Sequence, residues 1–156
     1  MKKLFGSTAI ALVLIIVLAS TVFASGQHLL LKGSLETTET QQPMFPTLYV
    51  SATGSGNATQ LGLFTISGQA QVNIPTLASS TSAILVAADG STLVGAGSGQ
   101  GTLTSTPGIV SIVETYAITG GTGRFTGASG SFAVERLLNR ATGNSSGTLS
   151  GTIVLP

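Results

Sequence analysis

The sequence predicts an all-β protein, a single antiparallel up-and-down β-barrel of roughly eight strands that follows an N-terminal signal helix. Apolar residues fall in short alternating runs rich in Val, Ile, Thr and Phe, as in half-buried strands. Gly, Asn, Ser and Pro separate these runs at regular intervals, which is typical of hairpins. Without helices to cover it, such a sheet must close on itself or fold into a sandwich, and the regular hairpin spacing favours the barrel.

The first 24 residues have the three parts of a secretory signal. A positive start, Met1-Lys2-Lys3, precedes the unbroken apolar run of residues 9–19, and Val22-Phe23-Ala24 presents small residues where a signal peptidase cuts. An uncleaved membrane anchor is the alternative, but a spanning helix needs roughly 20 apolar residues and this run is shorter. The sequence therefore predicts a signal peptide over residues 1–24, cleavage after Ala24, a secreted protein without a stable membrane anchor, and one mature domain over residues 25–156.

Composition limits what the mature domain can do. Cysteine is absent, so neither disulfides nor thiolate metal sites hold the fold. Charged residues make up 7% of the chain, against about 25% in average proteins. Without Lys2 and Lys3, the chain keeps four Lys and Arg against five Asp and Glu, a net charge of −1. So few cations cannot supply the phosphate contacts of a nucleic-acid-binding protein.

Nine runs have the alternation and composition of strands. They are His28–Thr38, Thr47–Thr53, Gln60–Ile66, Gln69–Ile74, Ser82–Ala88, Ser91–Ala96, Ile109–Ile118, Ser129–Leu137 and Gly147–Leu155.

Turn residues separate most of these runs. The strongest hairpin signal is Asp89-Gly90, because a tight hairpin needs residues that tolerate a positive φ. The other predicted turns are residues 54–57, Pro107-Gly108, Gly120-Gly121 and Gly143-Asn144.

Two segments are ambiguous. The segment Thr40–Pro46 contains two prolines and is predicted to be a surface loop. The segment Ala133–Ala141 is the only one with the composition of a helix, but it is short, and we interpret its first half as strand and its end as a turn.

A short internal echo links two segments of the chain. Gly62-Leu63-Phe64-Thr65 is similar to Gly123-Arg124-Phe125-Thr126, and a further glycine and valine follow each at a similar distance. The echo arises either by chance in a chain rich in Gly and Thr, or because two similar corners turn the chain between long strands.

The most distinctive sequence motif is GGTGRF at residues 120–125, followed by GASG at residues 127–130. This motif resembles a segment of the dirigent and allene oxide cyclase-like β-barrel superfamily. Residues 58–65 are similar to a stretch of its small bacterial members, and the closing residues 146–153 also fit. The resemblance implies an eight-stranded antiparallel barrel with a hydrophobic lumen, often trimeric in plants. Plant members cyclise a reactive fatty-acid epoxide or steer phenoxy-radical coupling.

Several enzyme classes are disfavoured by the residues present. His28 is the only histidine and lies near the mature N-terminus, where we expect it exposed in the first strand rather than in a catalytic triad. No zinc ligand set, P-loop or dinucleotide-binding glycine motif occurs, so we predict neither a metal nor a cofactor.

Glu114 is the most unusual charged residue. Along Ile109–Ile118, it shares a face with Tyr116 in an otherwise apolar row, and Phe132 and Arg136 share a face of Ser129–Leu137. If both faces line the lumen, Glu114 meets Arg136 in an apolar cavity, and its carboxyl is expected to form an ion pair or to stay protonated. These residues are the candidate ligand site, and Glu114 and Tyr116 are weak catalytic candidates.

A structural interpretation stands beside the functional one. Glu114 either serves a site or merely caps a barrel end or pairs with a surface cation. Arg124 is expected to form a structural salt bridge or backbone clamp, and the glycines of residues 120–123 to allow positive φ and close backbone approach.

Three functions agree with this sequence. The first is an exported barrel that binds a small apolar or amphipathic ligand in its lumen without strong catalysis. The second is a cyclase- or dirigent-like enzyme, an isomerase in class, that shapes a reactive hydrophobic substrate. The third is a structural or adhesive surface protein, because low charge and Ser/Thr-rich faces suit homo-oligomers, with a trimer implied by the resemblance.

Overall fold

The structure is a computed structural model that describes residues 26–156. The predicted signal peptide lies outside the described residues. Within the described part, no helix is long and apolar enough to cross a membrane. The chain forms eight strands and a short 3-10 helix, with these bounds: β1 Gln27–Met44, β2 Thr47–Ala58, β3 Gly62–Asn73, β4 Ala78–Val86, β5 Thr92–Leu103, β6 Ile109–Gly121, η1 Gly123–Phe125, β7 Ser129–Asn139 and β8 Asn144–Leu155.

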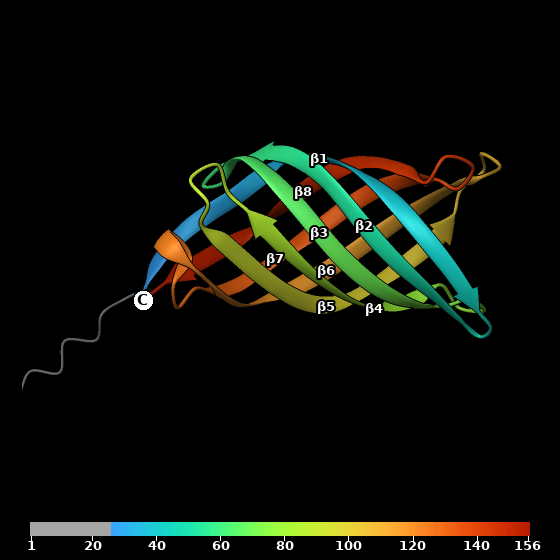
Figure 1. Ribbon diagram of the computed structural model, residues 1–156, viewed down its shortest axis with the longest axis horizontal. Coiled ribbons are helices and arrows are strands. Elements are labelled where there is room, and N and C mark those ends of the chain that lie inside the picture. Colours follow the sequence, from blue (N-terminus) through green and yellow to red (C-terminus); the bar gives the residue numbers. More distant parts are fainter. Residues whose placement is uncertain (1–25) are drawn as a thin grey trace, which may run out of the picture.

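The strands close into one barrel (Figure 1). Each strand pairs antiparallel with the next along the chain, and β8 pairs with β1 from Gln27 opposite Leu155 to Thr38 opposite Asn144. Closure leaves no strand edge in the barrel wall, so the ladder satisfies the backbone groups without a covering helix. This architecture confirms the predicted all-β, up-and-down barrel.

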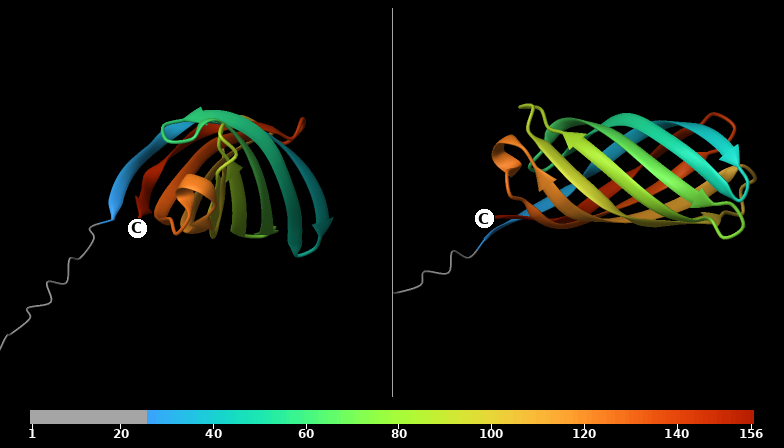
Figure 2. Two further views of the ribbon diagram at one scale, coloured as in Figure 1. Left: turned by 60° about the vertical axis from the view of Figure 1, so that its left-hand side comes forward. Right: turned by 60° about the horizontal axis from the view of Figure 1, so that its bottom comes forward.

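The two ends of the barrel differ. The terminal end carries the C-terminus, the start of β1 and the turns that join β2 to β3, β4 to β5 and β6 to β7, with η1 in the last of these (Figures 1 and 2). The four remaining connections lie at the opposite end, which we call the open end. His28 is exposed near the start of β1, as expected.

The terminal half of the lumen is filled by side chains. Alternate residues of each strand point inward and are buried or half-buried, as the period of two requires. The largest fully buried side chains are Phe125, Phe132, Leu31, Leu61, Leu85, Leu93, Leu149 and Ile153.

The prediction of nine strands is wrong in one place. Gln60–Ile66 and Gln69–Ile74 form the single strand β3, because Gly68 stays in the ladder between Ala52 of β2 and Ala83 of β4. The turn predicted at residues 54–57 is also wrong, since these residues lie within β2. The glycines in this segment let β2 lie close to β1, because a Cβ at Gly54 would collide with the backbone of β1.

The structure decides both ambiguous segments. The segment Thr40–Pro46 is not a loop along its length, because β1 continues to Met44 opposite Thr47 of β2. Its side chains are exposed as a surface loop would be, and polar outward residues do not end a strand whose backbone is paired. The interpretation of Ala133–Ala141 as a strand that ends in a turn is confirmed, and the strand β7 extends to Asn139.

The GGTGRF corner holds the terminal end together. Gly123 has a φ of +60°, and Gly121 leaves no room for a Cβ between Thr92 and Phe125. The turn places the Phe125 side chain in the core, where it is 1% exposed. Arg124 lies over the Phe125 ring and pairs with Asp89 of the neighbouring turn at 3.0 Å, which confirms the expected salt bridge.

The internal echo marks two corners that agree only at their start. Gly62 and Gly123 both have a left-handed φ, of +64° and +60°, and Phe64 and Phe125 are both buried. Beyond the glycine the corners diverge, because Gly62 begins β3 whereas Gly123 begins η1.

Replacing Gly123 by alanine should destabilise the protein more than replacing Gly90. Both glycines have positive φ, which costs an alanine about 1–2 kcal/mol. At Gly90 a Cβ meets nothing within 4 Å, whereas at Gly123 it would press on Ser91, whose Oγ accepts a hydrogen bond from the Arg124 amide at 3.2 Å. Urea unfolding followed by circular dichroism should show a further loss of about 1 kcal/mol for Gly123→Ala. Equal losses would contradict the packing assigned to this corner.

Candidate functional site

Strands β6 and β7 bring the four candidate residues into the lumen. Glu114 and Tyr116 alternate inward along β6, and Phe132 and Arg136 do so along β7. The two strands are neighbours, with Glu114 opposite Val134 and Tyr116 opposite Phe132. The faces therefore meet as the sequence predicted, while the ligand-binding and catalytic roles of these residues stay predictions.

Arg136 and Glu114 form a two-point ion pair inside the barrel. Arg136 donates from Nε to Glu114 Oε2 at 3.1 Å and from a terminal nitrogen to Glu114 Oε1 at 3.2 Å. Their side chains are only 8% and 7% exposed. Glu114 thus neither caps a barrel end nor pairs with a surface cation, because its partner is a buried arginine.

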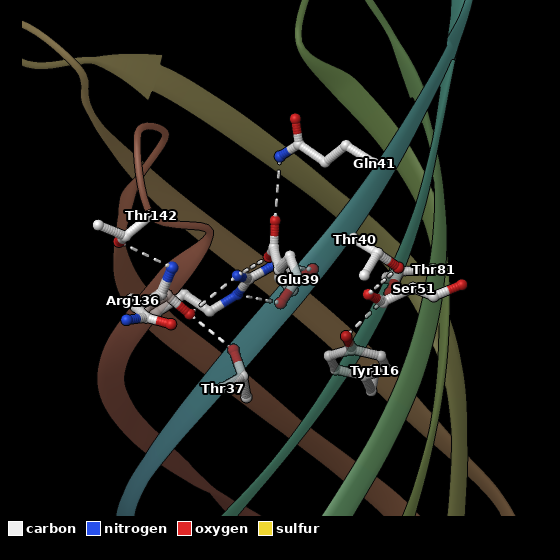
Figure 3. Close-up of polar contacts among 12 residues, drawn as sticks. Thr37, Glu39, Thr40, Gln41, Ser51, Thr81, Tyr116, Arg136 and Thr142 are labelled. Carbon is white, nitrogen blue, oxygen red and sulfur yellow. Dashed lines mark hydrogen bonds and ion pairs between the residues drawn. The ribbon is translucent and has the colours of Figure 1, made fainter.

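A second carboxylate, Glu39 of β1, completes the cluster (Figure 3). The other terminal nitrogen of Arg136 donates to Glu39 and to Ser145 Oγ of β8, the latter at 3.1 Å. Ser145 in turn shares a hydrogen bond of 2.7 Å with Thr37. Arg136 therefore links β7 to β6, β8 and β1 from the inside of the barrel.

Sequence reasoning missed Glu39 because it ended the first strand at Thr38. The sequence pattern that could have revealed it is the alternation along β1. Leu31, Leu35, Thr37 and Glu39 share one face at a period of two, and all are buried. Extending that alternation by one residue would have placed the carboxylate in the lumen.

The surroundings of Arg136 keep its guanidinium charged. Burial lowers the pKa of Arg136, but the hydrogen bonds and charges of Glu114 and Glu39 more than offset burial and raise the pKa above its usual range. We call Glu39, Arg136 and Glu114 the charged floor. It holds two carboxylates for one guanidinium, and each buried charge has a partner.

Tyr116 lies on the terminal side of the charged floor. Its ring stacks on Phe132 with centroids 4.8 Å apart, and its hydroxyl shares a hydrogen bond of 2.8 Å with Thr81 of β4. Gly95 of β5 makes room for the rings, since a Cβ there would lie 3.1 Å from Phe132. Burial, with a contribution from the charge of Glu114, raises the pKa of Tyr116 well above its usual value.

Two cavities flank the charged floor. A small one of about 30 Å³ lies on the side of Tyr116, lined also by Thr81, Glu114 and Arg136, and is large enough for a water molecule. The larger one, which we call the funnel, has a volume of about 610 Å³ and lies toward the open end. Its apolar wall comes from Leu48, Val72, Ile74, Leu77, Val110, Ile112 and Leu138.

The funnel has an apolar body and a polar base. Glu39, Glu114 and Arg136 line its base, and the exposed Arg140 lines its mouth. A glycine of β5, Gly101, lines the funnel, and a Cβ there would lie 3.3 Å from Leu77 Cβ. An apolar concavity with a few convergent polar groups is the usual form of a small-molecule site. Among residues 26–156, no three His, Cys, Asp or Glu side chains gather as metal ligands would.

Comparison with known proteins identifies the fold. No family model and no curated protein matches the sequence. Among solved structures, a pterocarpan synthase dirigent protein matches with a TM-score of 0.55 over 96% of this chain and 99% of that chain, at 17% sequence identity. At this low identity the match shows the fold alone. The match confirms the dirigent-like β-barrel fold that the GGTGRF segment suggested.

Removing the buried guanidinium of Arg136 should lower the free energy of unfolding more than removing the exposed guanidinium of Arg124. In Arg136→Gln, Glu39 and Glu114 would stay buried without a counter-charge, a situation that costs about 3–5 kcal/mol. In the control Arg124→Gln, the lost pair with Asp89 is half exposed and screened by solvent, so the loss of stability should be much smaller. Urea unfolding at neutral pH compares the two variants. Similar losses in both would show that the charged floor is not buried as described.

The raised pKa of Tyr116 predicts a loss of stability at alkaline pH. A group whose pKa is higher in the folded state stabilises fully below its unfolded pKa, here about 10, and that contribution is lost as the pH rises through the folded pKa. The free energy of unfolding of the wild type should therefore fall more steeply above pH 10 than that of Tyr116→Phe. Parallel pH profiles of the two proteins would contradict the burial of this hydroxyl.

Proposed function

We propose that this protein binds a small apolar or amphipathic ligand in the funnel, and that it does so after export. The observation that carries the proposal is the funnel itself, a space of about 610 Å³ with apolar walls and polar groups gathered at its base. A lumen needed only for stability would be expected to be filled with side chains, as the terminal half is.

Binding accounts for the polar groups better than strong acid–base chemistry. Glu39 and Glu114 are engaged by Arg136, and Arg136 donates most of its hydrogen bonds within the cluster. Both carboxylates are thus fixed in position by the guanidinium, an arrangement that suits orientation of a ligand.

A dirigent- or cyclase-like enzyme is the second candidate. It is favoured by the likeness to the dirigent protein described as a pterocarpan synthase. In this chain Glu114 would lie beside a substrate in the funnel, whereas Tyr116 lines only the small cavity on the other side of the charged floor. At 17% identity the likeness brings over no residue roles, so this activity ranks below binding.

Export remains part of the proposal because of the predicted signal peptide. Residues 1–24 have the pattern of a cleaved signal, and the mature barrel needs no disulfides to persist outside the cell because its ladder is closed. The homo-oligomer that the resemblance implies also stays a prediction.

Uptake of a neutral apolar dye tests the binding proposal. N-phenyl-1-naphthylamine should fluoresce on saturable binding to the mature protein. Ile112 lines the funnel, so Ile112→Trp should fill it and weaken binding at least about tenfold. The neighbouring Val113 points outward and is 45% exposed, so Val113→Trp should bind as the wild type does.

The outcome depends on both variants being folded, which circular dichroism and the unfolding temperature establish. Absence of saturable binding to the wild type would remove the proposed function. Equal binding to Ile112→Trp and the wild type would place the dye outside the funnel and remove the site.

A further inference from the structure

We propose that the funnel selects an amphipathic ligand whose head is a primary ammonium group and whose tail is apolar. This inference rests on the proposed function and adds the chemical class of the ligand. The head would lie against the charged floor, and the tail would lie along the apolar wall toward the open end.

The hydrogen-bond donors of the charged floor are nearly all in use. A guanidinium has five N–H groups. In Arg136, two of these donate to Glu114, at 3.1 and 3.2 Å, one donates to Glu39, and one donates to Ser145 Oγ at 3.1 Å. Only one N–H therefore remains for a ligand that needs donors, such as a carboxylate or phosphate, and any further bond from Arg136 would displace an existing one.

The hydrogen-bond acceptors of the charged floor are only half used. An ionised carboxylate offers about four acceptor positions. Glu114 receives two hydrogen bonds, both from Arg136. Glu39 receives one from Arg136 and a longer one of 3.3 Å from Gln41. The spare capacity thus lies in the carboxylate oxygens, and an ammonium group, with three donors and no acceptor, complements it.

The net charge at the base of the funnel also favours a cationic head group. Two carboxylates face one guanidinium, so the charged floor carries a net charge of −1. The apolar wall around it lowers the local dielectric and strengthens the attraction for a cation. The other charged group lining the funnel is Arg140, which is exposed to solvent at the mouth. It lies just past the end of β7, in the turn that follows Asn139, and is screened by water.

Three probes with the same decyl tail and different heads test this selection. Decylamine, decanol and decanoate are titrated at pH 7 into wild-type mature protein loaded with N-phenyl-1-naphthylamine, below the concentrations at which they form micelles. Decylamine should displace the dye at concentrations at least about tenfold lower than decanoate, with decanol between them. Decanoate displacing as well as or better than decylamine would overturn the inference.

The same titrations separate this inference from the proposed function. If the dye binds and no head group is preferred, or no probe displaces it, the ammonium class is wrong while the binding site stands. If the dye itself does not bind, the proposed function fails first.

A matched pair of variants locates the preference. Glu114→Gln removes one negative charge of the charged floor and should reduce the preference for decylamine over decanol at least about fivefold. Glu135→Gln makes the same change on the exposed outer face of β7 and should leave the preference unchanged. A preference that survives Glu114→Gln and Glu39→Gln, with both variants folded, would show that the head does not lie at the charged floor.

Discussion

The pairing of β8 with β1 is the constraint on which the rest of the structure depends. Once Gln27 lies opposite Leu155 and Thr38 opposite Asn144, the register of the barrel is closed and every second residue of each strand faces one shared interior. A slip of one residue would turn Leu31, Leu35 and Glu39 out to solvent together. Closure therefore decides both what fills the lumen and which polar groups meet inside it.

The charged floor separates the interior into a terminal half that is filled by side chains and an open half that is not. On the terminal side, Phe125, Phe132 and aliphatic side chains fill the space, and the burial of this apolar surface supplies much of the stability. On the open side the wall is apolar but no side chains fill the space, so those residues contribute less to stability than a filled core would. Burying three charges between the halves is costly unless each is paired, and Arg136 meets that condition by bridging β6, β8 and β1.

The sequence predicted the barrel and two of the three residues of the charged floor because both follow from local alternation. Glu114 and Arg136 each interrupt an apolar row within strands whose bounds were close to the observed ones. Glu39 was missed since prolines and glutamines beyond it are typical of a loop, and only pairing with β2 shows that β1 continues. The funnel could not be predicted, because its volume depends on how Gly101 and the wall residues meet across strands distant in the sequence.

Intermolecular nuclear Overhauser effects would test the central claim most directly, that a ligand occupies the open half of the lumen. With methyl-labelled mature protein and bound N-phenyl-1-naphthylamine, cross-peaks should connect the dye to the methyl groups of Ile112 and Leu138, which line the funnel. Val113 and Leu137 lie one residue away on the outer face and should give none. Cross-peaks to Val113 and Leu137 without any to Ile112 and Leu138 would contradict the account.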